Sequence, residues 1–158
     1  MIRPLDQEDN SVILAIINSA AQAYKGVIPE DCWHEPYMSP QELAGELQAG
    51  VTFFGYEDEG RVVGVMGRQD LGEVTLIRHA YVDPAWQRRG IGQLLLHHLL
   101  AGLSGSVLVG TWAAAHWAVR FYEQNGFTLV SPQEKDRLLR THWSITDRQI
   151  ETSVVLAR

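Results

Sequence analysis

The sequence has a single cysteine, Cys32, so no disulfide bond can form within the chain, and nothing like a zinc-ligand cluster surrounds it. This favours a reducing, intracellular setting. No apolar stretch approaches the ~20 residues that a membrane helix needs, and no basic leader followed by an apolar run opens the chain. We therefore expect a soluble, cytoplasmic protein that does not bind membranes.

Basic residues are also scarce: 13 lysines and arginines face 19 aspartates and glutamates, which gives a formal charge of −6. Non-specific nucleic-acid binding needs a basic face, so the charge argues against that class of partner. The negative charge could steer a cationic substrate toward the protein. Internal repeats and linkers are absent, and 158 residues fit one domain, which we expect to span residues 1–158.

Hydrophobic periodicity predicts alternating groups of strands and helices. Ser39 and Glu42 have capping-box spacing with Pro40 between them, and Asp58–Gly60 is typical of a hairpin turn. The expected strands are Ile2–Leu5, Val51–Glu57, Arg61–Gln69, Glu73–Asp83, Ser106–Gly110, Phe127–Val130 and Gln149–Ala157. The expected helices are Val12–Tyr24, one from Ser39, Ile91–Ser104, Ala113–Asn125 and Glu134–Arg140. This order indicates a mixed α/β fold rather than a regular βαβ array.

A glycine-containing loop, Asp83–Gly92, reads D-P-A-W-Q-R-R-G-I-G and joins a strand to a helix. Backbone N–H groups at a helix N-terminus lack partners, glycine permits close approach, and Arg88 and Arg89 add positive charge. The loop is therefore suited to a pyrophosphate. Its spacing matches neither a dinucleotide-binding loop nor a Walker loop. The alternative is a turn with solvated arginines.

Two motifs give a more specific indication. Gln87–Gly92 reads Q-x-x-G-x-G after a strand, and Ala118–Tyr122 followed by Asn125–Phe127 reads A-x-x-F-Y with N-G-F. Together they resemble the coenzyme A loop and the A-x-x-[FLY]-Y-x-x-x-G-F motif of the GNAT superfamily of N-acyltransferases. The recognisable core covers about Val51–Val130.

The resemblance implies a central, mostly antiparallel twisted sheet, splayed in the middle, with helices on both faces. It also implies direct transfer of an acetyl group from acetyl-CoA to a primary amine of a small molecule or peptide in a ternary complex, with no metal. Backbone groups of Ala80, Tyr81 and Val82 are expected to hold the pantetheine arm. The residues expected around the pyrophosphate are Gln87, Arg88, Arg89, Gly90, Ile91 and Gly92.

The same resemblance makes Tyr122 the candidate acid that protonates the departing thiolate, since a phenol with a reference pKa near 10 stays protonated at neutral pH. The general base is open. His79 is one candidate because an imidazole can take a proton near neutral pH, directly or through water. Glu73, near the start of the same strand, is the other. Arg78 and His79 are adjacent polar residues in a central strand, so we expect one of them to face the cleft, although both could be structural.

The acceptor surface is implied to include Tyr24, Trp33, Glu35 and Tyr37, whose aromatic rings could cover an amine, although Trp33 and Tyr37 could equally anchor their loop on the core. One departure from the family matters, because Ala115 stands where many relatives carry an asparagine that contacts coenzyme A. It keeps open a second function, a non-catalytic sensor of acyl-CoA. An exchanged or paired C-terminal strand could also make a homodimer.

Overall fold

The computed structural model describes residues 1–158. Internal contacts divide the chain into two compact units, one formed by Met1–Ala23 with His34–Gly105 and the other by Tyr24–Trp33 with Ser106–Arg158. Each unit combines antiparallel strands with helices, which confirms the expected mixed α/β class.

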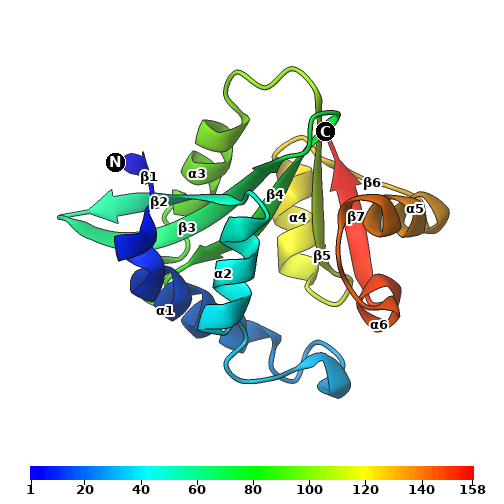
Figure 1. The fold of residues 1–158 in the computed structure, drawn as a ribbon, viewed down its shortest axis with the longest axis horizontal. Helices are drawn as coiled ribbons and strands as arrows, with labels where there is room; N and C mark the ends of the chain where they lie inside the picture. Colours follow the sequence, from blue (N-terminus) through cyan, green and yellow to red (C-terminus); the bar gives the residue numbers. More distant parts are fainter. The chain divides into compact units, whose positions relative to one another are not determined.

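The first unit contains four strands in the order of the sequence. They are β1 (Ile2–Pro4), β2 (Thr52–Asp58), β3 (Arg61–Asp70) and β4 (Val74–Val82), and each is antiparallel to the next (Figure 1). The turn between β2 and β3 holds Glu59 at φ 50° and Gly60 at φ 78°. Two such consecutive residues suit the right-handed twist of a hairpin, so the predicted turn is confirmed.

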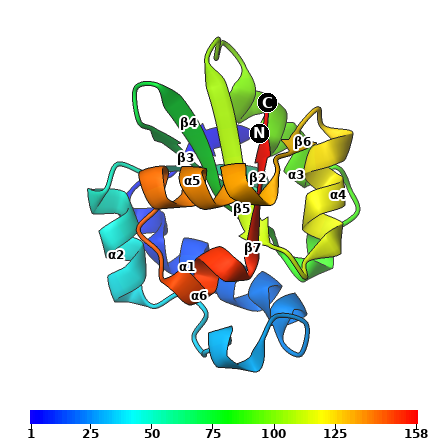
Figure 2. The ribbon, with the colours of Figure 1, turned by 90° about the vertical axis from the view of Figure 1, so that its right-hand side faces the viewer.

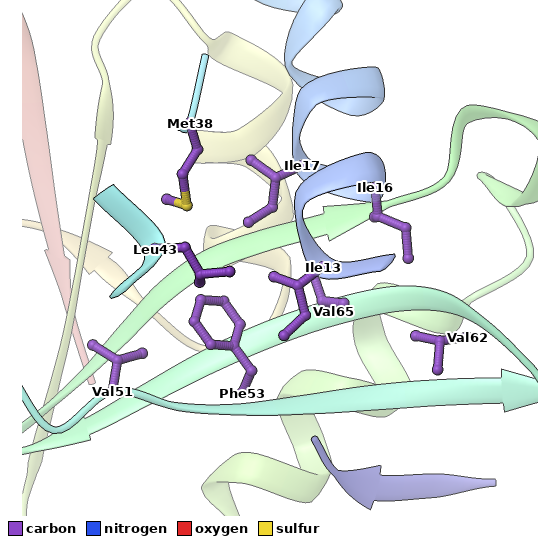
Figure 3. Close-up of a cluster of buried hydrophobic side chains, with 9 residues drawn as sticks. All are labelled: Ile13, Ile16, Ile17, Met38, Leu43, Val51, Phe53, Val62 and Val65. Atoms are coloured by element: carbon purple, nitrogen blue, oxygen red, sulfur yellow. The ribbon is translucent and has the colours of Figure 1, made fainter. Parts of the chain in front are cut away.

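Two helices cover one face of this sheet: α1 (Asn10–Ala20), which follows the short turn η1 (Gln7–Asp9), and α2 (Pro40–Gln48). Figure 3 shows Phe53 pointing from β2 toward Leu43 of α2 and Ile13 of α1. Burial of this apolar surface is the main force that holds the helices on the sheet. The cluster consists of Ile13, Ile16, Ile17, Met38, Leu43, Val51, Phe53, Val62 and Val65.

The opposite face of the sheet carries α3 (Ile91–Leu100). Gly64 of β3 makes this approach possible, because a Cβ atom there would lie 2.9 Å from Cγ2 of Ile91 and 3.3 Å from Cδ1 of Leu95. Helices therefore lie on both faces of the first unit's sheet, as expected.

The strand β4 contains a bulge opposite Met66. Val65 pairs with Tyr81 and Gly67 pairs with Arg78, so His79 and Ala80 both oppose Met66. His79 has φ 56°, a value that is uncommon for a residue with a side chain. A bulge of this kind bends the strand and re-aims side chains.

The second unit has the strand β7 (Ser153–Ala157) between β5 (Ser106–Trp112) and the short β6 (Thr128–Leu129), and both pairs are antiparallel. In Figure 1, α4 (His116–Gln124) and α5 (Pro132–His142) lie on opposite sides of β5 and β7. Figure 2 shows α5 crossing in front of β5. Leu139 of α5 and Trp143, the residue after this helix, lie against Gly110 of β5.

One predicted strand is present but is wrong in its first residues. The expected strand Gln149–Ala157 begins only at Ser153, because Asp147–Glu151 forms the helix α6. Thr146 and Gln149 make a reciprocal capping box at its start, in which the side chain of each accepts a hydrogen bond from the other's backbone N–H. This cap stabilises a helix where the alternation of apolar residues favoured a strand. The remaining short helical turns are η2 (Ala21–Tyr24), η3 (Glu30–Cys32) and η4 (Pro84–Trp86).

Candidate active site

The loop after β4 is held by its own side chains. The carboxylate of Asp83 accepts a hydrogen bond from the backbone N–H of Ala85 at 2.9 Å and so begins the turn η4. Nε2 of Gln87 donates to the carbonyl oxygen of Val82 at 3.1 Å. The glutamine of the first motif therefore closes the loop on the end of β4 and fixes where the next residues begin.

Gly90 is the N-cap of α3 and has φ 80° and ψ 8°, a left-handed conformation that glycine adopts without strain. Its carbonyl oxygen accepts the first bond of the helix from the N–H of Leu94, at 3.0 Å. The N–H groups of the first turn have no partners within the helix, and they carry the positive end of its dipole. No atom outside the loop lies within 4 Å of the place where a Cβ atom of Gly90 would be. The loop is thus open to an anion.

The two arginines of the loop have different surroundings. The guanidinium group of Arg89 lies over the ring of Trp86, with its central carbon 4.6 Å from the ring centroid, which is within the range of a cation–π contact. Arg88 is exposed and has φ 65°. The ring contact fixes one positive charge beside the start of α3.

His79, in the bulge of β4, is paired with a carboxylate from a helix. Its Nε2 lies 2.9 Å from Oε2 of Glu46, on α2, and Nη1 of Arg78 lies 3.1 Å from the same oxygen. The imidazole ring also stacks on Phe53, with the ring centroids 5.8 Å apart and the planes at 25°. The neighbouring Arg78 and His79 thus contact one shared carboxylate.

The charges of this cluster stabilise one another. Burial alone would raise the pKa of the Glu46 carboxyl, but the hydrogen bond with His79 and the charges of His79 and Arg78 outweigh burial and hold that pKa below its usual value. Burial lowers the pKa of Arg78, against an opposite effect of Glu46. An arginine keeps its charge through such a shift, so Glu46 and Arg78 form an ion pair at neutral pH.

Glu73 lies elsewhere in the same unit. It is exposed in the turn between β3 and β4, beside Gly72, at the end of β4 that is opposite to the glycine loop. It lies six positions before His79, which corresponds to about 20 Å of extended strand at ~3.3 Å per residue. The structure does not bring the two candidate bases together.

Tyr122 is buried within the second unit, on α4. Its ring meets the rings of Phe121 and Phe127 edge to face, at centroid distances of 5.2 Å and 5.6 Å. Burial, and to a smaller extent the neighbouring Tyr24, raises the pKa of the Tyr122 phenol above its usual value. The phenol therefore stays protonated throughout the neutral range and can only donate a proton there.

The residues predicted for the acceptor surface fall in both units. In the second unit, Tyr24 stacks on Trp117, with ring centroids 6.0 Å apart, and Trp33 follows the turn η3. In the first unit, Oε1 of Glu35 accepts a hydrogen bond from Gln22 at 3.3 Å, and the ring of Tyr37 stacks on that of His34. None of these contacts identifies an acceptor.

Glu46 is the residue of this site that the sequence analysis missed. It lies three residues after Leu43, which is 1% exposed, so helical spacing places both on the face of α2 that covers the sheet. A carboxylate on the buried face of an amphipathic helix is the one signal in the sequence that could have found it.

No group of three or more histidine, cysteine, aspartate and glutamate side chains is arranged to hold a metal ion. None of the helices combines the length and the apolar character required to span a bilayer.

Most of the chain matches a known protein family, and part of it matches a curated relative. A family model described as "Acetyltransferase (GNAT) domain" matches residues 14–145, a range that runs through both units. A curated relative, the [ribosomal protein bS18]-alanine N-acetyltransferase of Salmonella typhimurium, is 33% identical over 91 residues. That alignment covers 55% of this chain and 56% of the relative, so the chain spans just over half of the relative's length.

Solved structures share the whole fold. The PaiA N-acetyltransferase of Thermoplasma acidophilum, solved with coenzyme A, is 18% identical with a TM-score of 0.73, over 100% of this chain and 97% of the other. The ribosomal-protein-S18-alanine N-acetyltransferase of Escherichia coli is 18% identical with a TM-score of 0.68, over 99% of this chain and 91% of the other. At these identities the likeness shows a common fold.

Proposed function

This chain belongs to the GNAT family of acetyltransferases, and we propose that it transfers the acetyl group of acetyl-CoA directly to a primary amine. The observation that carries the proposal is the loop from Gln87 to Gly92, whose backbone opens α3 beside a fixed arginine. The curated relative supports it, because its name describes an N-acetyltransferase that acts on an alanine.

The loop fits the pyrophosphate of coenzyme A. Unpaired N–H groups at the start of α3 can donate to phosphate oxygens, and Arg88 and Arg89 supply charge of the opposite sign. Gly90 leaves the backbone open to close approach. Backbone groups of Ala80, Tyr81 and Val82 are proposed to hold the pantetheine arm, as the family resemblance implies.

Transfer requires a bond from the amine nitrogen to the carbonyl carbon and cleavage of the bond from that carbon to sulfur. We propose that Tyr122 gives its phenolic proton to the departing thiolate, since the phenol is protonated throughout the neutral range and can donate as negative charge develops on sulfur. Positioning of the two substrates can supply a further ~7–11 kcal/mol of the barrier.

The proton that the amine loses needs an acceptor, and we propose His79 for this role. Two features support this role: His79 is paired with Glu46 and partly buried, and it lies beside Ala80 in the bulge of β4. Glu73 is the weaker candidate because it is exposed in the turn before β4. In His79→Ala, an ionisation should disappear from the pH profile of kcat/KM, and an unaltered profile would return the role to Glu73 or to water.

The acceptor is proposed to be a primary amine of a peptide or a small molecule. A peptide with N-terminal alanine is the first one to test, since the name of the curated relative gives an alanine of ribosomal protein bS18 as its acceptor. A cytoplasmic location and a homodimer stay predictions.

The decisive experiment measures release of free thiol from acetyl-CoA across a panel of amines that includes such a peptide. We expect thiol release that depends on the amine. The specific observation that favours the alternative, an acyl-CoA sensor, is Ala115. It is the N-cap residue of α4 and makes no side-chain cap hydrogen bond. Tight binding of coenzyme A without thiol release for any amine would support the sensor and contradict the enzyme.

A further inference from the structure

The pairing of His79 with Glu46 suggests how the base works. We propose that Glu46 is a positioning residue that holds His79 by Nε2, so that Nδ1 is the nitrogen that accepts the proton of the amine. The inference rests on the proposed role of His79 as the general base. Its evidence is the distance of 2.9 Å from Nε2 to Oε2 of Glu46.

The tautomer follows from the chemistry of the partner. An ionised carboxylate can only accept hydrogen bonds, so the nitrogen that faces it must carry the hydrogen. Glu46 is ionised at neutral pH, since its pKa is held below the usual value. A neutral His79 therefore has its hydrogen on Nε2 and its lone pair on Nδ1. The other hydrogen bond of an imidazole commonly selects its reactive nitrogen in this way.

The imidazole has little freedom to turn away from this arrangement. Its backbone is fixed at φ 56° within the bulge, and one face of the ring stacks on Phe53. Only 17% of its side chain is exposed. A non-glycine residue in this conformation is strained, and such strain gathers at functional sites. The strained conformation and the carboxylate partner are two separate observations that single out the same residue.

The carboxylate itself is anchored from a second side. Arg78 forms an ion pair with Glu46, with Nη1 3.1 Å from Oε2, and the same Nη1 donates a hydrogen bond to Oε1 of Gln69 at 3.3 Å. Gln69, on β3, donates in turn to the carbonyl oxygen of Ala49 at 2.9 Å, at the C-terminal end of α2. This network joins α2 to the sheet, so Glu46 cannot swing away from His79 without breaking it. The charged or titratable groups of the cluster are Glu46, Arg78 and His79, while Gln69 and Phe53 are neutral.

The first test reads the tautomer directly, without any activity. In protein labelled with ¹⁵N, the chemical shifts of the two ring nitrogens show which one carries the hydrogen when the imidazole is neutral. We expect Nε2–H to dominate for His79 in the native protein and a mixture of both tautomers in Glu46→Gln. The control is Glu8→Gln, which removes one charge from an exposed residue and should leave the spectrum of His79 unchanged. A native protein with Nδ1–H, or an identical tautomer in Glu46→Gln, would overturn the proposal.

The second test asks whether Glu46 acts through His79. General-base catalysis raises reaction rates by about 10²–10⁴-fold. In Glu46→Gln the imidazole is no longer held in orientation, so we expect kcat to fall by about tenfold, a part of that contribution. In the His79→Ala background, the same change should have no further effect, because there is no imidazole to position. An equal loss in both backgrounds would make Glu46 merely structural and refute the inference.

The two tests fail in distinguishable ways. If His79→Ala retains full activity, His79 is not the base, and the proposed role of Glu46 in proton transfer falls with it. The acetyltransferase function would stand in that case, since thiol release is measured on the native protein. If no amine is acetylated, the function itself fails, while the tautomer measurement still decides whether Glu46 orients the ring.

Discussion

Replacement of Gly90 by glutamate tests the donor site most directly. The new side chain would place bulk and a negative charge at the start of α3, where the pyrophosphate is proposed to bind. The chain offers a matched control in Gly60, in the turn between β2 and β3. Gly60 has φ 78° against 80° for Gly90, and neither position has any atom within 4 Å of an added Cβ.

The matched geometry separates stability from binding. A non-glycine residue in the left-handed region costs roughly 1–2 kcal/mol, so Gly90→Glu and Gly60→Glu should lose similar stability. For a chain of this size, Tm should fall by about 2–8 °C in each. Only the carboxylate of Gly90→Glu should repel the pyrophosphate of coenzyme A. With about 5–8 Å between unit charges and an effective dielectric constant near 20, each carboxylate–phosphate pair costs roughly 2–3 kcal/mol, or about 30- to 140-fold in Kd.

Titration calorimetry with coenzyme A measures this difference at low and high salt. We expect Gly60→Glu to bind like the native protein and Gly90→Glu to bind at least about 30-fold more weakly. The difference in Kd between the two variants should decrease as the salt concentration rises, because ions screen the repulsion between carboxylate and phosphate. Native affinity in a folded Gly90→Glu protein, or equal losses in both variants, would refute the assignment of the loop.

Four other changes have definite expected outcomes. Tyr122→Phe should lower kcat and leave the Kd of coenzyme A nearly intact, and a normal kcat in steady-state assays would make Tyr122 a packing residue. Gly64→Ala should cost about 1–3 kcal/mol, because its Cβ would lie 2.9 Å from Ile91. Gly45→Ala, in a helix with no neighbour within 4 Å, should instead stabilise by about 0.5–1 kcal/mol in urea unfolding. Because the pKa of Glu46 is lowered in the fold, its contribution is complete above about pH 4.3 and is lost as the pH falls through the lower folded value. The stability difference between native protein and Glu46→Gln should therefore shrink in acid, and a difference that grows in acid would contradict the ion pair.

Most elements could be predicted from local patterns, and the errors have local causes too. The capping box of Ser39 and Glu42 is present as predicted, with both of its hydrogen bonds. The helix predicted to reach Ser104 ends at Leu100, because Ala101 turns to ψ 128° and Gly102 follows with φ 79°. The missed helix α6 had an equally readable cap in Thr146. Apolar periodicity hid both features, since it reports burial and says little about where a helix begins or ends.

Local sequence patterns predict some residues of the candidate site and miss others. The loop around Gly90 and the position of Tyr122 follow from contiguous residues, so motifs in the sequence could place them on their helices. The contact between Glu46 and His79 joins residues 33 positions apart, and no local pattern specifies it. It depends on the packing of α2 against the sheet, which is a property of the whole core.

The bulge in β4 explains why the sequence does not predict the directions of the adjacent side chains Arg78 and His79. Two adjacent polar residues in a central strand predict that one of them faces the cleft, and alternation in a regular strand would send the two to opposite faces. In the structure, Arg78 and His79 both contact Oε2 of Glu46. The extra residue opposite Met66 and the φ of 56° at His79 break the alternation at this point. A regular strand could not direct both an imidazole and a guanidinium group to one carboxylate. The irregularity of the backbone is therefore what creates the cluster, and the sequence carries no residue pattern that marks it, because His79 occupies a position where glycine would have been the usual signal.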